Sequence, residues 1–310
     1  MLKNKRIVIT GGAGFIGSNI ARSLCEENEV IVIDNLLTGC YENISDIADH
    51  IRFVRDDVNN LDMLMNEFLS VDYVLHQAAL PSVQRSVEDP ITSNMNNIDG
   101  TLKVLVAALD CDVKKVVCAS SSSVYGDTPI LPKQEEMKPN PKSPYAITKL
   151  AGEYYSRVFS EVYGLKTVCL RYFNVFGPRQ NPSSQYAAVI PLFITRILNR
   201  KSPIIFGDGL QTRDFTFVKD VVQANVLAME SPAEGVFNIA CGHQITLNDL
   251  ADRIMKIVGI EVKKVYDRPR KGDIKDSLAD ITYAREMLGY EPKFDLNSGL
   301  KETIAWFQKK

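Results

Sequence analysis

The feature that most constrains the fold is a glycine-rich stretch close to the N-terminus. A β-branched run, RIVIT (residues 6–10), leads directly into GGAGFIG (residues 11–17), which has glycines at positions 11, 14 and 17. The run predicts a strand, and the glycines allow a sharp turn into a helix at a point where any Cβ would obstruct a close backbone approach. The N-terminus of that helix offers free N–H groups and a positive dipole end, which suit phosphate groups. The stretch therefore predicts a strand–turn–helix unit that binds a diphosphate.

Short apolar runs and segments with helical spacing alternate through the first half of the chain. The runs that read as strands are RIVIT (6–10), VIVID (30–34), IRFVRDDV (51–58), DYVLHQAA (72–79), KKVVCASS (114–121) and LKTVCLRYFN (165–174). Helical spacing occupies residues 15–28, 61–69, 93–110 and 145–163. This alternation predicts parallel βαβ units, and near-continuous apolar strands fit a parallel sheet that is buried on both faces. We expect an α/β fold, a doubly wound parallel sheet of the Rossmann type.

An acidic residue stands where the second expected strand ends. Asp34 follows Gly17 by 17 residues, and a carboxylate at this place accepts hydrogen bonds from both ribose hydroxyls and repels a 2′-phosphate. A plain tight turn, or an aspartate that only caps a loop, accounts for each feature singly but not for their spacing. Together they predict a bound dinucleotide, NAD rather than NADP. Asp57, which ends the third expected strand, is a further candidate for contact with the adenine amine.

The residue pattern of the sequence changes at Gly177, where the Pro- and Ser-rich loop GPRQNPSSQY begins. Later prolines at positions 191, 203, 232, 269 and 292 divide the chain into shorter elements. We expect an NAD-binding domain over residues 1–175 and a smaller substrate-binding lobe over residues 176–310. The two are expected to interleave, because GVFNIACG (235–242) is a candidate strand that returns to the main sheet.

Composition and charge exclude several other classes of protein. The 310 residues carry a formal net charge of −2 and no basic stripe, so nucleic acid is not expected as a partner. No apolar run approaches the ~20 residues that span a membrane, and the first strand begins too early to leave room for a signal peptide. The six cysteines and three histidines are dispersed, without CxxC pairs or metal-ligand spacing. We expect a reduced, metal-free, cytoplasmic protein.

The stretch SPYAITK (143–149) places a tyrosine and a lysine four residues apart. In a helix, Tyr145 and Lys149 share one face, and four serines (120–123) end the fifth expected strand at the sheet edge where open α/β folds bind ligands. Ionising a phenol of pKa ~10 at neutral pH costs roughly 4 kcal/mol, which a nearby cation in a partly buried site can supply. A positively charged nicotinamide would add to this effect. The pair predicts a base beside an oxidised cofactor, with a serine that holds a substrate hydroxyl; three unrelated surface residues are the alternative.

At this point the sequence resembles a known family. GGAGFIG, Asp34, SSSSVYG and YAITK together are similar to the extended short-chain dehydrogenase/reductases that act on nucleotide sugars. The resemblance extends over essentially the whole chain, since LRYFNVFGPRQ, YAAVIP, GDGLQTRDFTFVKD and RPRKGD match segments that line the sugar-nucleotide pocket in that family. The branch it resembles most is the UDP-hexose 4-epimerases, particularly those that accept N-acetylated sugars. The resemblance implies NAD-dependent 4-epimerisation of UDP-GlcNAc and UDP-GalNAc, and of UDP-Glc and UDP-Gal, through a transient 4-keto intermediate.

The resemblance also implies a role for each catalytic residue. Tyr145 would remove the proton of the sugar 4-hydroxyl while C4 delivers a hydride to NAD+, and Lys149 would bind the nicotinamide ribose and lower the Tyr145 pKa. Ser121 would hydrogen-bond the reacting oxygen, with Ser122 as its close competitor. The 4-keto intermediate would turn in the pocket and take the hydride back on its other face, so that NAD stays bound.

The motifs shared with the resembled family also imply the remaining site residues, by their positions within those motifs. Those expected to contact the cofactor are Gly11, Gly14, Phe15, Ile16, Gly17, Asp34, Asn35, Thr38, Gly39, Asp57, Val58, Gln77, Ala78, Ala79, Asn97, Tyr145, Lys149 and Phe173. Those expected to hold the nucleotide sugar are Ser82, Ser122, Asn174, Ala188, Val189, Ile204, Phe206, Arg213, Arg270, Asp273 and Ser277. The two arginines suit a diphosphate because a guanidinium fork meets anionic oxygens in pairs, although a structural ion pair is the alternative for each.

One departure from the family pattern bears on the substrate. Ser277, four residues after the aspartate of KGD, stands where relatives restricted to glucose and galactose have a bulky tyrosine. The lost volume should make room for an N-acetyl group at C2, and ALPSVQRS (79–86) also resembles the N-acetylhexosamine branch. A serine here also tolerates either substituent, so dual specificity stays open.

The same residues bear on other functions that share this fold. A sugar 4,6-dehydratase needs an acid after the hydroxyl residue, where this chain has Ser122 and Ser123, and serine is too weak an acid. The glutamate typical of UDP-glucuronate decarboxylases is absent from the same stretch. A UDP-glucuronate 4-epimerase stays open, and a non-catalytic NAD-binding scaffold should have lost Tyr145 or Lys149, which are both present. Helices near 93–110 and 145–163 resemble those that pair into a four-helix interface in the family, so we expect a homodimer.

Overall fold

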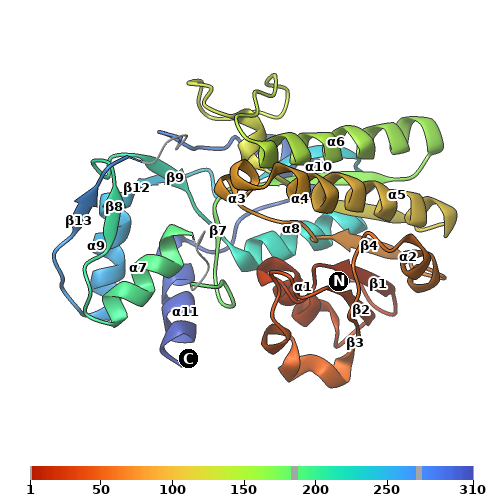
Figure 1. Ribbon diagram of the computed structural model, residues 1–310, viewed down its shortest axis with the longest axis horizontal. Coiled ribbons are helices and arrows are strands. Elements are labelled where there is room, and N and C mark those ends of the chain that lie inside the picture. Colours follow the sequence, from red (N-terminus) through yellow and green to blue (C-terminus); the bar gives the residue numbers. More distant parts are fainter. Residues whose placement is uncertain (1, 183–187, 270–273, 310) are drawn as a thin grey trace.

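The computed structural model describes residues 2–182, 188–269 and 274–309, arranged as a larger lobe built on a parallel sheet and a smaller lobe beside it (Figure 1). The predicted substrate residues Arg270 and Asp273 lie outside the described residues. The two lobes interleave in sequence, because β11 (Gly235–Ile239) pairs with β6 (Thr167–Tyr172) in the larger lobe after the chain has entered the smaller one. The proposed boundary between residues 175 and 176 stays a prediction.

A seven-stranded sheet forms the centre of the larger lobe. Its other strands are β1 (Arg6–Thr10), β2 (Glu29–Ile33), β3 (Ile51–Val54), β4 (Tyr73–His76) and β5 (Lys115–Ser121). The strand order is β11-β6-β5-β4-β1-β2-β3, and all neighbours are parallel. The order reverses between β1 and β4, and ligands of doubly wound sheets bind outside the carboxyl ends of the strands at such a point. The predicted doubly wound parallel sheet is confirmed.

Helices cover both faces of this sheet. One face carries α1 (Phe15–Leu24), α8 (Val218–Glu230) and α10 (Thr282–Leu288), and the other carries α2 (Leu61–Glu67), α5 (Gly100–Asp110) and α6 (Pro144–Tyr163). Within β1, Ile7 and Ile9 belong to the core on the α1 side, whereas Val8 belongs to the core on the α5 side. Both sides of the strands are therefore buried, which explains why the strand sequences are apolar without alternation.

The smaller lobe has a core of its own. Helices α7 (Val189–Leu198), α9 (Leu247–Val258) and α11 (Leu296–Gln308) pack together beside two short strand pairs. The pairs are β8 (Ile204–Phe206) with β13 (Val265–Asp267), and β9 (Thr212–Asp214) with β12 (Gln244–Thr246). A third pair, β7 (Val175–Phe176) with β10 (Thr216–Phe217), lies near the junction of the lobes (Figure 1).

Several predicted elements end earlier than the sequence indicated. β3 stops at Val54 rather than at residue 58, because the chain turns and the Asp57 carboxylate accepts the Asn59 N–H at 2.8 Å. β4 stops at His76, β6 at Tyr172 and α1 at Leu24. The single helix expected over 93–110 consists of α4 (Pro90–Asn94), a π-helical turn η3 (Met95–Asp99) and α5. The remaining short elements are α3 (Val83–Glu88) and the 3-10 turns η1 (Tyr41–Asn43), η2 (Ser45–His50) and η4 (Ser122–Tyr125).

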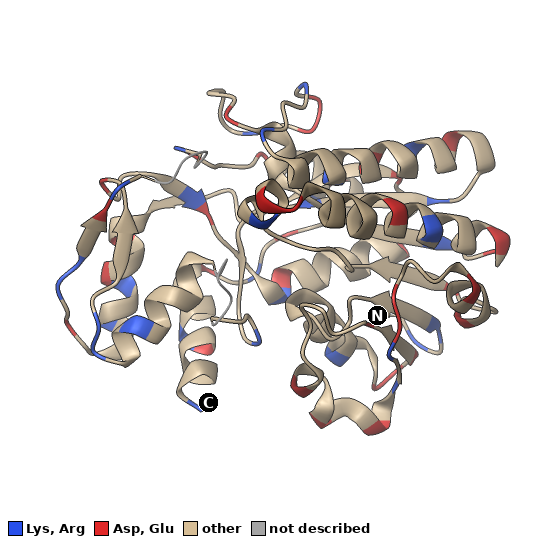
Figure 2. Ribbon diagram, in the orientation of Figure 1, with Lys and Arg blue, Asp and Glu red and all other residues tan. Residues whose placement is uncertain are grey.

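Charged residues of both signs are interspersed over the two lobes (Figure 2). This distribution agrees with the small net charge of −2. Among the described residues, no helix combines the length and the apolar character that a bilayer crossing requires. The same residues contain no cluster of three or more His, Cys, Asp and Glu side chains that is arranged to hold a metal ion.

A buried histidine links three elements of the larger lobe. The His76 Nδ1 lies 2.7 Å from the Thr10 hydroxyl and its Nε2 lies 2.9 Å from the Thr101 hydroxyl. Burial, together with the charge of Lys149, lowers the pKa of His76 to about 3. Because both ring nitrogens are already hydrogen-bonded in the core, we assign this residue a structural role as a neutral imidazole.

This low pKa should make the protein sensitive to acid. Below pH ~6.5 the unfolded chain binds a proton at residue 76 while the native imidazole stays neutral down to about pH 3, so stability is complete above pH ~6.5 and falls as the pH drops through this window. The expected loss is about 1.4 kcal/mol per pH unit, or on the order of 2 kcal/mol at pH 5. Urea unfolding of wild type and His76→Asn at pH 7 and pH 5 measures the difference, with the exposed His243→Asn as control. Equal acid losses in wild type and His76→Asn would contradict the assignment.

Candidate active site

A cavity of ≈ 850 Å³ opens at the switch point of the sheet. Its walls come from the carboxyl ends of β1, β2, β4 and β5, the start of α1, the first turns of α6 and the segment 179–181. Parallel strands end at one edge of the sheet, so residues that are distant in sequence converge there.

The glycine turn forms the floor of this cavity. Gly11 has a φ of +67°, and a Cβ at this residue would lie 2.6 Å from the backbone nitrogen of Ala78. A Cβ at Gly17 would collide with the carbonyl oxygen of Gly11. Both positions therefore require glycine, and the predicted turn from β1 into the N-terminus of α1 is present and lines the cavity. This backbone cradle, which a side chain would fill, fits a diphosphate beside the N–H groups of α1.

Asp34 lines the cavity at the end of β2 and connects two loops. Its Oδ2 accepts the Ala13 N–H at 3.0 Å and its Oδ1 accepts the Leu36 N–H at 2.8 Å. Burial raises the pKa of Asp34, and these backbone hydrogen bonds act in the opposite direction. A Cβ at Gly39 would lie 2.8 Å from both carboxylate oxygens, so the loop can approach the carboxylate closely. Each oxygen keeps a lone pair, which fits the predicted ribose contact.

Asp57 does not occupy the place that the sequence predicted. It lies beyond the end of β3 and is not part of the cavity wall, which contains its neighbours Asp56 and Val58 instead. Its Oδ2 accepts from the Asn35 side chain at 2.7 Å, and its Oδ1 accepts from the Asn59 side chain at 3.0 Å. Asp57 therefore holds the Asn35 loop in place, and its contact with the adenine amine stays a prediction.

Tyr145 and Lys149 lie together in the first turns of α6, and both line the cavity. The helix starts there because the Ser143 side chain caps it by accepting the Ala146 N–H at 3.1 Å, and Pro144 occupies the first turn. The Lys149 Nζ donates to the Ala119 carbonyl at 2.9 Å and lies 5.9 Å from the centroid of the Tyr145 ring. The predicted neighbourhood of phenol and ammonium is therefore observed in the fold.

The protein groups alone do not lower the pKa of Tyr145. Burial raises the pKa of Tyr145, and only a hydrogen bond with Ser121 acts against burial. Burial also lowers the pKa of Lys149 to about 8, while its hydrogen bond goes to a backbone carbonyl. Burial thus outweighs the Ser121 hydrogen bond at Tyr145, and the expectation that Lys149, aided by a positively charged nicotinamide, lowers the Tyr145 pKa stays a prediction.

The serines at the end of β5 have different surroundings. Ser120 lines the cavity and donates to Glu153 Oε1 at 2.5 Å, and Glu153 forms a buried ion pair with Arg171 at 2.8 Å. Ser121 is the serine that hydrogen-bonds with Tyr145 and also caps η4 by accepting the Ser123 N–H at 3.2 Å. Ser122 is the first residue of η4 and has no contact of this kind with Tyr145. The geometry favours Ser121 over Ser122 as the hydroxyl that acts with the phenol.

Two alanine substitutions should separate these serines. We expect Ser121→Ala to lower kcat by about 10- to 100-fold, since one hydrogen bond to a reacting oxygen is lost, whereas Ser122→Ala should change kcat less than about threefold. Initial rates for the two variants under identical conditions provide the comparison. A larger loss for Ser122→Ala would reverse the assignment.

The structure brings most, but not all, of the predicted residues to the cavity. Those that line it are Gly11, Gly14, Phe15, Ile16, Gly17, Asp34, Asn35, Thr38, Gly39, Val58, Gln77, Ala78, Ala79, Ser82, Tyr145, Lys149 and Ala188. Those that lie outside its wall are Asp57, Asn97, Ser121, Ser122, Phe173, Asn174, Val189, Ile204, Phe206, Arg213 and Ser277. Ser121 nevertheless reaches the site through its hydrogen bond with Tyr145.

The residues outside the wall mostly support it. Asn97 is buried, accepts the Leu80 N–H at 2.7 Å and donates to the Thr148 hydroxyl at 3.0 Å, so it joins a wall segment to α6. Phe173 is fully buried in the core. Asn174 donates to the Asp214 carbonyl at 3.1 Å.

The predicted sugar-nucleotide residues of the smaller lobe also have structural contacts. The Arg213 Nη1 donates to the Thr212 carbonyl at 2.8 Å and to the Lys275 carbonyl at 3.3 Å. Ile204 and Phe206 belong to β8 and pair with β13. Direct substrate roles for these residues and for Ser277 stay predictions.

Sequence reasoning missed several wall residues, among them Asn43, Tyr172, Arg179 and Gln180. Arg179 and Gln180 belong to the GPRQ stretch, whose match to the family was a usable signal. Asn43 follows no motif, and only its position in the fold reveals it.

Comparison with known proteins agrees with this arrangement. The model of the NAD dependent epimerase/dehydratase family matches residues 7–240. The UDP-glucose 4-epimerase of Mycolicibacterium smegmatis is 39% identical over 98% of this chain and 99% of its own. The structure of UDP-N-acetylglucosamine 4-epimerase from Methanobrevibacter ruminantium M1, in complex with UDP-N-acetylmuramic acid, is 44% identical, covers 99% of both chains and has a TM-score of 0.97. UDP-glucuronic acid 4-epimerase from Bacillus cereus, in complex with UDP-glucuronic acid and NAD, is 33% identical, covers 98% of this chain and 99% of its own, and has a TM-score of 0.90. The glycine turn, the cavity at the switch point and these matches establish that the chain belongs to the NAD dependent epimerase/dehydratase family.

Proposed function

We propose that the protein is an NAD-dependent 4-epimerase of UDP-hexoses, with UDP-GlcNAc and UDP-GalNAc as its preferred pair. The observation that carries the proposal is the joint placement of Tyr145, Lys149 and the glycine turn on one cavity. Relatives with matching chains act at C4 of UDP-sugars.

The residues around the cavity fit NAD. Gly11, Gly14 and Gly17 leave backbone space for a diphosphate at the start of α1, and the Asp34 carboxylate offers acceptors for ribose hydroxyls. Tyr145 and Lys149 line the same cavity, and the reactive end of the cofactor is expected beside them. When bound, NAD+ supplies an acceptor for the hydride that leaves C4 of the sugar and a donor that returns it.

The protein groups then manage the proton of the 4-hydroxyl. Ser121 and Tyr145 hold the sugar oxygen between them, and the Tyr145 phenolate takes the proton as the C4–O bond becomes a carbonyl. Since burial raises the Tyr145 pKa, the phenolate depends on positive charge from both Lys149 and the oxidised cofactor. When the hydride returns to the other face of the ketone, Tyr145 gives the proton back and the 4-hydroxyl is restored with inverted configuration.

The direct experiment uses purified protein with UDP-GlcNAc and no added cofactor. NMR should show UDP-GalNAc, and heat-released supernatant should contain NAD. Unchanged substrate in a folded protein that carries NAD would favour the non-catalytic scaffold instead.

The size of residue 277 tests the preference for N-acetylated sugars. Ser277 is small, and we propose that it leaves room for the N-acetyl group. Ser277→Tyr should lower kcat/KM for UDP-GlcNAc by about 100-fold or more through a steric clash, while UDP-glucose changes by less than about threefold. Equal losses for the two substrates would remove residue 277 from the specificity argument.

UDP-glucuronate is the second candidate substrate. A relative of 33% identity is a UDP-glucuronic acid 4-epimerase, and an acidic C5 substituent needs only a small polar pocket. A panel of UDP-GlcNAc, UDP-GalNAc, UDP-glucose, UDP-galactose and UDP-glucuronate, compared by kcat/KM, decides between the candidates.

We also propose a homodimer that forms through the outer faces of α5 and α6 and their neighbours. Apolar side chains are exposed along this side of the chain at Ile91, Met95, Ile147, Val158 and Val162. Such an apolar face is typical of a subunit interface. Sedimentation equilibrium measures the mass, and a monomer at micromolar concentration would refute the proposal. A cytoplasmic location stays a prediction.

A further inference from the structure

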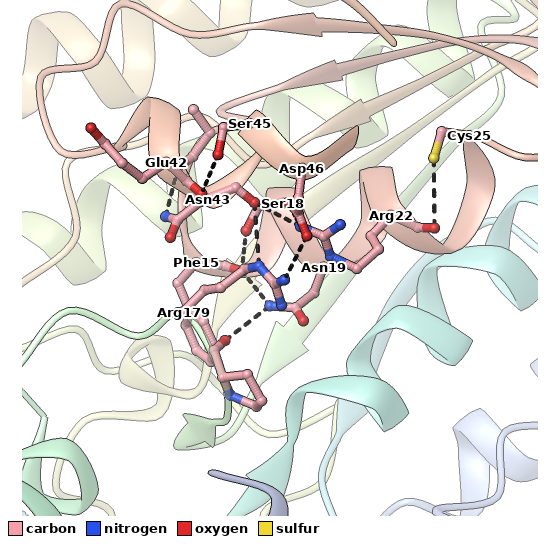
Figure 3. Close-up of polar contacts among 12 residues, drawn as sticks. Phe15, Ser18, Asn19, Arg22, Cys25, Glu42, Asn43, Ser45, Asp46 and Arg179 are labelled. Atoms are coloured by element: carbon pink, nitrogen blue, oxygen red, sulfur yellow. Dashed lines mark hydrogen bonds and ion pairs between the residues drawn. The ribbon is translucent and has the colours of Figure 1, made fainter. Parts of the chain in front are cut away.

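A short segment from the far half of the sequence crosses the edge of the cofactor cavity. Residues 178–180 follow β7, and Arg179 and Gln180 line the cavity. Figure 3 shows Arg179 pointing toward Asn43 and Asp46, beside the first turns of α1. We call Pro178–Gln180 the strap.

Side chains from α1 and η2 fasten the strap. The Arg179 Nε donates to the Asn43 carbonyl at 3.2 Å, and its Nη2 lies 3.6 Å from Asp46 Oδ2. Arg22 meets the same two partners, since its Nη2 donates to the Asn43 carbonyl at 2.9 Å and to Asp46 Oδ1 at 2.6 Å. Asn19 adds a third attachment by donating to the Pro178 carbonyl at 3.1 Å (Figure 3). One carboxylate and one carbonyl thus join two guanidiniums, a network rather than an isolated surface pair.

The fastening extends to the glycine turn. The Asn43 side chain is buried and donates to the Ala13 carbonyl at 3.0 Å, within GGAGFIG. Asn43 therefore connects the strap anchor to the backbone that is proposed to hold the diphosphate. Asn43 would therefore transmit a movement of the strap to the glycine turn.

Two further observations indicate that the strap is built around a ligand. Arg179 has a φ of +73°, a left-handed conformation that costs energy for a residue other than glycine and is held here by its side-chain contacts. Gln180 lines the cavity, and its Oε1 is buried without a hydrogen-bond partner. A buried acceptor of this kind expects a donor, and a hydroxyl of a dinucleotide is a suitable one.

We propose that the anchored strap retains the dinucleotide between turnovers, and that Asp46 and Asn19 are positioning residues which slow its release. The inference rests on the proposed NAD-dependent function and explains how an epimerase avoids losing a cofactor that it regenerates in each cycle. Neither Asp46 nor Asn19 lines the cavity; Asp46 acts through the two guanidiniums, and Asn19 holds the strap while it also donates to the carbonyl of the wall residue Phe15 at 2.8 Å. Without the Asp46 charge, Arg22 and Arg179 would face each other and the strap would loosen.

The rate of cofactor release tests this proposal. The protein is loaded with nicotinamide-deuterated NAD+, chased with unlabelled NAD+, and the bound fraction is followed by mass spectrometry. The double variant Asp46→Asn, Asn19→Ala should release the label about tenfold faster than wild type, because weakened contacts act mainly on dissociation. Asp252→Asn is the matched control: Asp252 is similarly exposed and pairs with Lys264 at 2.8 Å in the smaller lobe, and its release rate should equal that of wild type.

Two further measurements distinguish the strap from a direct contact between Arg179 and the cofactor. Arg179→Leu should release the label as fast as the double variant does. If Arg179→Leu releases it fast but the double variant releases it at the wild-type rate, Arg179 contacts the cofactor directly, and the strap proposal is overturned. Salt should speed release from wild type, since the Debye length falls from about 10 Å at 0.1 M to about 3 Å at 1 M, and should affect the double variant less. Release rates of wild type and double variant within about twofold of each other at low salt would also overturn the proposal. A wild type that never binds NAD would instead refute the proposed function.

Discussion

Replacing Tyr145 with phenylalanine is expected to lower kcat for UDP-GlcNAc by about 10²- to 10⁴-fold while leaving the protein loaded with NAD. The ring stays and continues to fill its place in the cavity, but the group that carries the proton of the 4-hydroxyl is lost. NAD should remain because Gly11, Gly17 and Asp34 are unchanged. Initial rates by NMR and the NAD content of heat-released supernatant measure the two effects separately.

The control for this variant lies on the same helix. Tyr163 ends α6 and is exposed, so Tyr163→Phe should keep the wild-type rate. If Tyr145→Phe also turns over at close to the wild-type rate, the proton is carried by another group and the proposed mechanism fails.

Replacing Gly17 with alanine should abolish retention of NAD, with an affinity loss of about 100-fold or more. The new Cβ would collide with the Gly11 carbonyl oxygen and lie 2.7 Å from the Gly12 Cα, and both contacts are backbone that cannot move without opening the turn. Stability should fall as well, by roughly 1–3 kcal/mol, as in other overpacked sites. The NAD content after purification and the urea midpoint provide the two measurements.

Gly152→Ala provides a matched control within another helix. A Cβ at Gly152 would meet only the Thr101 methyl group, at 3.7 Å, so alanine fits without strain. We expect this variant to keep its NAD and to gain about 0.5–1 kcal/mol, because alanine is the better helix former. Full NAD retention in Gly17→Ala would show that the glycine turn does not hold the diphosphate.

The parts that local sequence determines were predicted well. β-branched runs and helical spacing identified the sheet, because strands that are buried on both faces appear as continuous apolar runs between segments with helical spacing. The glycine turn and the Tyr145–Lys149 pair were found because each is formed by residues that lie close together in the sequence. Asp34 was found because the length of a βα unit fixes its distance from the turn.

The parts that depend on contacts between distant segments were not predicted. The end of β3 was placed too late, since the role of Asp57 as an acceptor for Asn35 and Asn59 is not visible in the sequence. The balance between burial and charge at Tyr145 also depends on how deeply α6 packs against β5. Arg179 reaches a site more than a hundred residues earlier in the chain, where Asn43 and Asp46 carry no motif.

The position of β11 has a consequence for how the chain acquires its structure. During synthesis β6 emerges long before residues 235–239, and until they arrive its outer edge presents unpaired N–H and C=O groups. The sheet of the larger lobe is therefore completed only after a part of the smaller lobe, including α7 and β8, has been synthesised. Because the larger lobe needs β11 to complete its sheet, we expect the two lobes to fold together rather than one after the other.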